Sequence, residues 1–215
     1  MSYGLQVVND SGAISLDSEY ARLCVFHESS YTAGVAISFS PVIDTQEPPL
    51  VFIRPQSNGS IIQLGVLING SPGSWTGCTV GSGQQHSGSI FVAAFLSKPV
   101  SSYGLRMWSA DGVQIFDSGK KAAVFTRVAQ NWSYTNSTQD VQGYITNWYS
   151  LPLNYASGDY LMINNARMPM MGGNNRNRTT GLRYDFASSL LRFSVTSITN
   201  PTYFLLPAVF GKISA

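Results

Sequence analysis

Residues 3–18 (YGLQVVNDSGAISLDS) and residues 103–118 (YGLRMWSADGVQIFDS) align without a gap, and six of the sixteen positions are identical. Each copy contains a short apolar run, a polar turn that ends in Gly, and a second short run closed by Asp-Ser. This order is typical of a β-hairpin, because Gly adopts the left-handed conformation that a type I turn with a bulge requires at its end. The repeat therefore predicts two related halves, each opening with a β-hairpin.

The Asp-Ser pairs that close the two copies are Asp17 with Ser18 and Asp117 with Ser118. Short polar side chains at such positions bond to nearby backbone N–H groups and so cap the strand that they follow. We therefore interpret Asp17 and Asp117 as structural residues and assign them no part in catalysis.

The composition favours an all-β fold. Hydrophobic residues make up 44% of the 215 residues, which is enough for sizeable cores, and charged residues only 11%. Few Glu–Lys pairs are available to stabilise helices, and no window keeps apolar residues at helical spacing over three turns. Short apolar runs recur about every 8 to 12 residues between Gly, Pro and Asn turns, as in sandwiches and jelly rolls.

We therefore predict two related β-sandwich-like or jelly-roll-like halves, residues 1–100 and 101–215. If the halves share a sheet, the boundary near residue 100 is only a landmark in the sequence.

Charge and hydropathy restrict the partners and the compartment. A net charge of +2, from 13 Lys and Arg against 11 Asp and Glu, provides no basic stripe for duplex nucleic acid. The start of the chain has no basic and apolar leader, and no run of about 18 apolar residues predicts a membrane span. We expect synthesis in a cytoplasm, where Cys24 and Cys78 are free thiols; a bridge between them is the alternative.

The sequence contains no recognisable catalytic or metal-binding motif. It has two histidines, His27 and His86, no serine in a nucleophile-elbow pattern, and no pair of His or Cys residues at metal-ligand spacing. We therefore predict no catalytic residue, no metal and no cofactor. A glycan-degrading enzyme stays as an alternative, because two acids that folding brings together are invisible in a sequence.

An aromatic segment interleaved with Asn and Gln supplies the candidate ligand site. Its ring faces can stack on sugar C–H groups while the amides bond hydroxyl groups. The candidate glycan-binding residues are Trp132, Tyr134, Trp148 and Tyr149. The competing interpretation is that these aromatic residues belong to the core or to a subunit interface.

A second segment is rich in Met, Gly, Asn and Arg and shows no apolar periodicity, which predicts a long exposed loop. Methionine side chains adapt to irregular contact surfaces, so we expect this loop to pack against a neighbouring subunit; phosphate binding is the weaker alternative. The candidate interface residues are Met168, Met170, Met171, Arg176 and Arg178.

The duplicated motif Tyr-Gly-Leu-x-(Val/Met)-x-x-x-x-Gly-x-x-x-(Leu/Phe)-Asp-Ser resembles one that recurs in small structural proteins of tailed bacteriophages and prophages. There it lies in tail-tip or tail-fibre regions. The resemblance implies a structural virion protein of the tail, made in the host cytoplasm, which contacts other tail proteins and contributes to host adhesion. It also implies a homo-oligomer, a trimer or hexamer around the tail axis.

Two other functions remain beside this one: a lectin-like module that binds a host surface glycan, and a free glycan-binding protein unrelated to phage.

Overall fold

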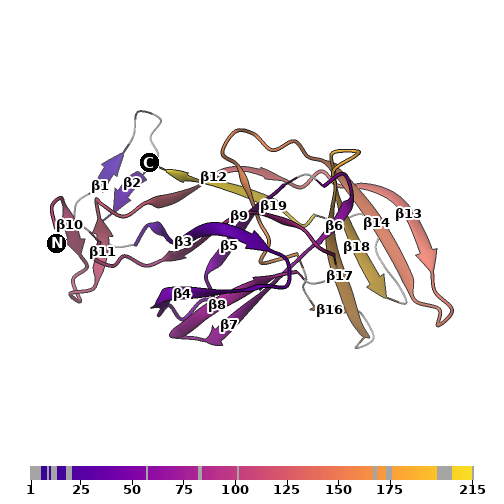
Figure 1. Cartoon of the computed structure of the whole chain (residues 1–215), viewed down its shortest axis with the longest axis horizontal. Coiled ribbons are helices and arrows are strands. Elements are labelled where there is room, and N and C mark those ends of the chain that lie inside the picture. The colour runs from indigo at the N-terminus through magenta and orange to yellow at the C-terminus, as the bar shows by residue number, and fades with distance from the viewer. Residues whose placement is uncertain are drawn as a thin grey trace.

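The computed structural model describes residues 6–8, 10, 14–17, 21–56, 58–81, 84–100, 102–166, 169–172, 176–197 and 205–214. All regular structure in these residues is β-strand, which confirms the predicted all-β class (Figure 1). The described residues form no helix, and therefore none that is long and apolar enough to cross a membrane.

Six strands close into a barrel at the centre of the molecule, in the order β12-β19-β15-β5-β9-β3. Closure between β12 and β3 rests on one register pair, Ala122 with Cys24, and on the hydrogen bond from Val25 N to Lys121 O (2.9 Å). The barrel strands are β3 (Leu23–Thr32), β5 (Leu50–Pro55), β9 (Ser87–Phe95), β12 (Ala122–Ala129), β15 (Tyr160–Met162) and β19 (Ala208–Ser214).

The barrel interior is filled by alternate residues of its strands. Phe52 and Phe91 lie at its centre, with ring centroids 4.5 Å apart and planes 12° from parallel. Gly211 of β19 makes room for this stack, because a Cβ atom there would lie 2.9 Å from Phe52 Cε1. Each fully buried aromatic ring contributes about 1.5–3 kcal/mol through removal from water, so this stack is a main source of barrel stability.

Two further sheets flank the barrel. A three-stranded sheet has the order β4-β8-β7, and a six-stranded sheet has the order β13-β14-β18-β17-β16 with β6 paired to β17. The first contains β4 (Ala36–Ile43), β7 (Val66–Ser71) and β8 (Ser74–Val80). The second contains β6 (Ile61–Leu64), β13 (Ser133–Gln139), β14 (Ile145–Pro152), β16 (Pro169–Gly172), β17 (Arg176–Asp185) and β18 (Leu190–Ser197).

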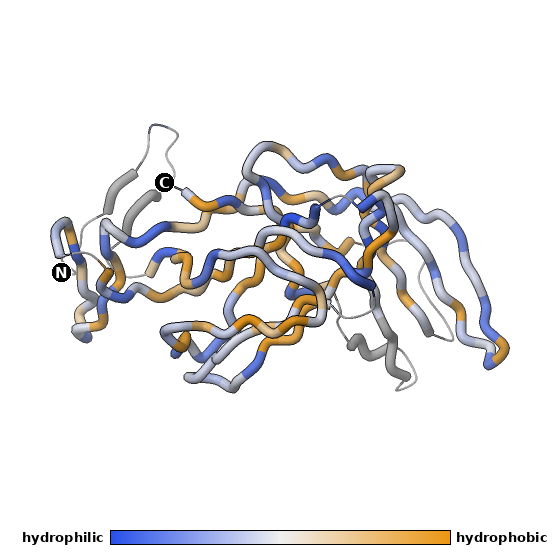
Figure 2. The backbone as a smooth tube through the Cα atoms, in the orientation of Figure 1, coloured by the Kyte–Doolittle hydropathy of each residue, from blue (hydrophilic) through white to orange (hydrophobic). Residues whose placement is uncertain are grey.

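One hydrophobic core joins the outer face of the barrel to both flanking sheets. It includes Val92 and Phe210 from the barrel, Ile43 from the three-stranded sheet, and Leu191 and Phe193 from the six-stranded sheet. Figure 2 shows the hydrophobic stretches gathered in these central strands, whereas the paired strands β13 and β14 are mostly hydrophilic. The sheets therefore pack face to face, as the sandwich prediction requires.

The two halves repeat one topology. The first contributes β3-β9-β5 to the barrel and forms β4-β8-β7; the second contributes β12-β19-β15 and forms β14-β18-β17. In the first half, β3 follows the hairpin and pairs with the last strand, β9, which also pairs with β5. In the second half, β12 follows the hairpin and pairs with the last strand, β19, which also pairs with β15. The halves join through β5 with β15 and through β3 with β12.

Because barrel and core are common to both halves, residue 100 separates two sequence repeats and does not separate two independently packed units. The closed barrel is the reason: each half supplies only three of its six strands.

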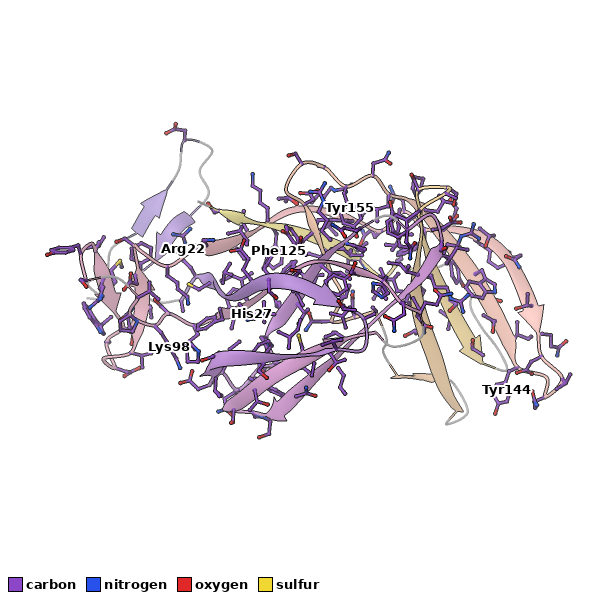
Figure 3. The ribbon with its side chains drawn as sticks, in the orientation of Figure 1. Arg22, His27, Lys98, Phe125, Tyr144 and Tyr155 are labelled. Carbon is purple, nitrogen blue, oxygen red and sulfur yellow. The ribbon has the colours of Figure 1, made fainter. Side chains whose placement is uncertain are left out.

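The duplicated motif forms two hairpins of the same register. In β1 (Gln6–Val8) and β2 (Ile14–Asp17), Gln6 pairs with Asp17 and a bulge follows Val7. In β10 (Arg106–Trp108) and β11 (Gln114–Asp117), Arg106 pairs with Asp117 and a bulge follows Met107. Both hairpins lie toward the same end of the long axis, while β13 and Tyr144 lie at the other (Figures 1 and 3).

The second hairpin has the predicted turn chemistry. Gly112 has a φ of 75°, and Ser109 N donates to Val113 O across the turn (2.8 Å). The residues of the first turn, apart from Asp10, lie outside the described residues.

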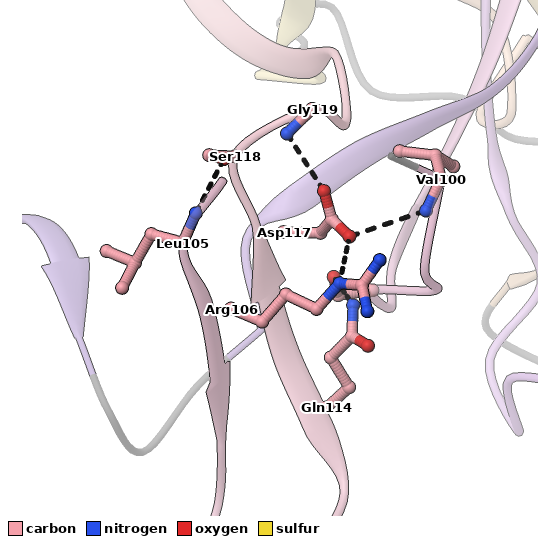
Figure 4. A network of polar contacts seen from close by, with 8 residues as sticks. Val100, Leu105, Arg106, Gln114, Asp117, Ser118 and Gly119 are labelled. Carbon is pink, nitrogen blue, oxygen red and sulfur yellow. Dashed lines mark hydrogen bonds and ion pairs between the residues drawn. The ribbon is translucent and has the colours of Figure 1, made fainter. Parts of the chain in front are cut away.

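Asp117 and Ser118 cap the second hairpin as predicted (Figure 4). Asp117 accepts hydrogen bonds from Gly119 N (2.8 Å) and Val100 N (3.3 Å), and Ser118 Oγ accepts one from Leu105 N (3.0 Å). The side chain of Asp17 is not among those described.

The Met and Arg segment is a hairpin, which corrects the prediction of a long loop. Strand β16 pairs with the start of β17, so that Met170 lies opposite Arg178 and Gly172 opposite Arg176. Backbone pairing with a neighbouring strand organises this segment even though its side chains show no apolar alternation. Met168 lies outside the described residues, and the side chains of Met170, Met171, Arg176 and Arg178 are not described.

Candidate functional site

A hollow of about 340 Å³ lies on the solvent-facing side of the six-stranded sheet. We call it the sheet hollow. Five strands contribute to it: β6, β13, β14, β17 and β18. Its lining residues are Ile61, Thr135, Asn136, Trp148, Tyr149, Ser150, Arg183, Leu190 and Arg192.

Strand register explains why these side chains meet. Asn136 of β13 lies opposite Trp148 of β14. Two residues further along β14, Ser150 lies opposite Arg192 of β18, which in turn lies opposite Arg183 of β17. Directly paired residues of antiparallel strands point to the same face, and so do residues two apart in one strand. The pairing thus builds two adjacent rows of polar side chains on one face.

A β-bulge in β13 shapes one wall of the hollow. The register shifts between Tyr134 and Asn136, which leaves Thr135 as an extra residue. Thr135 Oγ1 donates to the carbonyl oxygen of Trp148 at 3.0 Å. The indole Nε1 of Trp148 donates to Thr138 Oγ1 at 3.4 Å. Strand β13 therefore holds both the backbone of Trp148, through Thr135, and its indole ring, through Thr138.

The two arginines have different partners. Arg192 Nη2 lies 2.7 Å from Asp185 Oδ2, while its Nε is buried with no hydrogen-bond partner among the described residues. The Arg183 guanidinium lies over the Trp148 ring, 4.9 Å from its centroid. Cation–π stacking of this kind orients the plane of the guanidinium and leaves its N–H edges available.

Asp185 is committed to local structure. Its Oδ1 accepts hydrogen bonds from Ala187 N (3.1 Å) and Ser188 N (3.2 Å), which close the turn between β17 and β18. Hydrogen bonds from the side chain and the backbone of Ser188, followed by the hydrogen bond and charge of Arg192, hold the pKa of Asp185 below its ordinary value. Asp185 is therefore an anion that neutralises Arg192.

The sheet hollow lies where the two repeats differ. Strand β13 has no counterpart in the first half, where β4 occupies the position equivalent to β14 and pairs only with β8 among the described strands. Strand β6, from the first half, pairs with β17 of the second half. Both departures from the repeat border the hollow.

The structure places one of the four predicted glycan residues, Trp148, on the outer face. Tyr149 borders the hollow but is 1% exposed, with its side chain in the core. Tyr134 pairs with Tyr149 and packs edge-on against it at 5.9 Å. Trp132 donates from Nε1 to Leu206 O (2.6 Å) and packs against Phe193. The four residues therefore do not form one flat platform, because alternate residues of a strand point to opposite faces.

Sequence reasoning missed Arg192 and the role of Arg183 in this site. A signal was present: each arginine stands between two apolar residues, in Leu182-Arg183-Tyr184 and Leu191-Arg192-Phe193. In a strand with one buried face, such a residue points outward.

Three buried carboxylates of the described residues are held in ion pairs with arginines. The buried carboxylates Asp117, Asp159 and Asp185 pair with Arg106, Arg127 and Arg192. Among the described residues, no group of three or more His, Cys, Asp or Glu side chains is placed to hold a metal ion.

Both cysteines are buried and unbridged. Burial raises the pKa of Cys78 to about 11 and also raises the pKa of Cys24.

The two histidines occupy different environments. His86 is buried, with Nδ1 3.1 Å from the Tyr31 hydroxyl. The Nε2 atom of His27 lies 2.9 Å from Ser29 Oγ. Burial lowers the pKa of each.

Comparisons with protein-family models, curated proteins and solved structures gave no match to this chain.

Proposed function

We propose that this chain is a non-catalytic tail-tip or tail-fibre subunit of a tailed bacteriophage that contacts a host surface glycan through the sheet hollow. The observation that carries the adhesion role is the combination of Trp148, Arg183, Asn136 and Ser150 in the lining of one hollow. The duplicated motif supports the assignment to a phage tail by its resemblance to tail proteins.

The lining chemistry suits a hydroxyl-rich ligand. Asn136, Thr135 and Ser150 offer amide and hydroxyl groups, and Ile61 and Leu190 offer apolar contacts at the edge of the hollow. Saccharides present the same combination, with hydroxyl groups around a ring whose C–H faces are apolar. The site spans five paired strands, so ligand binding requires little ordering of loops.

The carboxylate pattern supports a binding role without turnover. None of the residues that line the hollow is a carboxylate, histidine or cysteine. A glycosidase requires two carboxyl groups flanking the scissile bond. Incubation with capsular, lipopolysaccharide or peptidoglycan fractions should release no reducing ends; turnover abolished by one Asp or Glu substitution would support the enzyme alternative.

The adhesion role is tested by binding of the purified chain to a panel of bacterial surface polysaccharides and to whole cells. Trp148→Ala should lose most of the binding, because it removes both the ring and the support of Arg183. Trp108→Ala is the control: Trp108 is a tryptophan accessible to solvent (54% exposed), but it lies in β10 at the opposite end of the molecule (Figure 1). Equal binding by the two variants would contradict the assignment of the site.

The tail assignment has a separate test. Mass spectrometry of gradient-purified virions should detect the chain, and its oligomeric mass in solution should correspond to a trimer or hexamer. If the chain is absent from particles and binds a glycan as a monomer, it is a free glycan-binding protein. If it is present in particles but binds no glycan, it is a structural tail subunit alone.

The predicted subunit interface belongs to this assembly question. We propose that the β16–β17 hairpin contacts a neighbouring subunit through Met168, Met170, Met171, Arg176 and Arg178. Replacing the three methionines with Ser should leave circular dichroism unchanged and weaken incorporation into particles. Unchanged incorporation would count against this interface.

A further inference from the structure

We infer that the sheet hollow recognises an anionic saccharide, a sugar ring that carries a carboxylate or a phosphate group. This inference rests on the proposed function of the same hollow and adds the chemical class of its ligand.

The first observation is a pair of like charges. Arg183 and Arg192 are direct partners in the antiparallel pairing of β17 with β18, and both line the hollow. In such pairs the Cβ atoms lie about 4.5–5.5 Å apart, and like charges at this spacing repel each other. The pairing therefore places two guanidinium-bearing side chains where one bound anion can reach both.

The second observation is that only one of the two arginine charges is neutralised by an ion pair among the described residues. Asp185 neutralises Arg192 at 2.7 Å, whereas no ion pair involving Arg183 is found among the described residues. The hollow therefore holds one uncompensated positive charge. A binding site for neutral sugar has no electrostatic need for it.

The third observation is the orientation of Arg183. Its guanidinium is held against the Trp148 ring, and Trp148 is itself fixed by the bonds of Thr135 and Thr138. A guanidinium held in this way presents a rigid pair of donors that matches a carboxylate or phosphate in bidentate geometry. Less side-chain entropy is lost on binding when the donor is already oriented.

The remaining lining residues suit the rest of the sugar. Asn136 and Ser150 lie in the same two rows as Trp148 and Arg192, where they can bond ring hydroxyl groups. Leu190 and Ile61 give the hollow an apolar border. Charge and hydroxyl recognition are thus combined within one hollow.

Three sugars that share one ring test the inference: glucuronate, glucose 1-phosphate and glucose. The ¹⁵N-labelled full chain is titrated with each, and the side-chain Nε–Hε resonances of Arg183 and Arg192 are followed. Glucuronate or glucose 1-phosphate should shift the Arg183 resonance at concentrations where glucose does not, and whichever acts at lower concentration identifies the anionic group. Binding should weaken in high salt, because an exposed charge is screened.

Arg183→Gln should weaken binding about tenfold or more, as expected for the loss of a charge-assisted hydrogen-bonded contact. Lys212→Gln is the matched control, because it removes one exposed positive charge from barrel strand β19. It should leave the affinity unchanged.

Equal shifts with glucose would overturn the inference and leave the proposed function in place. A response to none of the three sugars would also overturn it. The proposed function fails separately, if Trp148→Ala and Trp108→Ala bind polysaccharides and cells equally.

Discussion

Replacing Asp117 with Ala should destabilise the second hairpin and its attachment to the barrel. The Asp117 side chain is fully buried (0% exposed) and lies 2.9 Å from Arg106 Nε. It also accepts hydrogen bonds from Val100 N and Gly119 N, so it ties the hairpin to the chain on both sides (Figure 4). The substitution removes an anion that these donors share.

The magnitude follows from burial and the number of donors. Removing one partner of a buried ion pair costs about 3–5 kcal/mol, and a hydrogen bond to a charged group is worth about 1.5–3 kcal/mol. Arg106 retains 33% exposure of its side chain, so water can solvate it once its partner is lost. We therefore expect a loss of about 2–4 kcal/mol in the free energy of unfolding. Asp117→Asn should cost less, because it retains one acceptor oxygen.

Urea denaturation followed by tryptophan fluorescence measures the global loss, and amide hydrogen exchange in β10 and β11 detects local opening of the hairpin. Asp111→Ala is the matched control, since Asp111 is an exposed acid in the turn of the same hairpin. If the two variants differ by less than about 0.5 kcal/mol in both measurements, Asp117 does not anchor the hairpin and the reasoning is refuted.

Three further predictions concern the barrel and the core. Cys78 and Cys24 should resist a thiol reagent at about pH 8 until the chain unfolds, because burial raises both pKa values, that of Cys78 to about 11; rapid labelling of folded protein would contradict this. Burial lowers the pKa of His86, so below about pH 6.5 the unfolded chain binds a proton more readily than the folded chain does. The contribution of His86 to the free energy of unfolding is therefore complete above that pH and should fall on acidification. The urea midpoint of His86→Gln should then vary less than that of the wild type between about pH 7.5 and about pH 5.5. Gly211→Ala should lower the melting temperature, because its Cβ would crowd Phe52 at 2.9 Å; an unchanged or raised value would show that the ring shifts freely.

The local features of the fold could be predicted from the sequence. The hairpin at residues 106–117, its Gly112 turn and its Asp117 cap follow from turn chemistry and short-range hydrogen bonding. The β class follows from short apolar runs between turn residues. These signals are contained within a few residues of chain, so that no knowledge of partners is needed.

The candidate site could be predicted only in part. Residue type predicts Trp148, but Tyr149 is buried and Trp132 packs partly buried against the core, because alternation along a strand does not reveal which face is covered. Arg183 and Arg192 meet through the pairing of β17 with β18, and the hollow needs β6 from the other half of the chain.

Local stretches of sequence specified the all-β class and the turn and cap of the second hairpin, since these depend on local conformation and short-range bonds, whereas strand β16 forms through its pairing with β17. The tertiary structure decided that the halves close one barrel through β5 with β15 and β3 with β12, and that two arginines face each other in the sheet hollow. Strand partners far apart in the chain are selected by the packing of whole sheet faces, which no local stretch of sequence encodes.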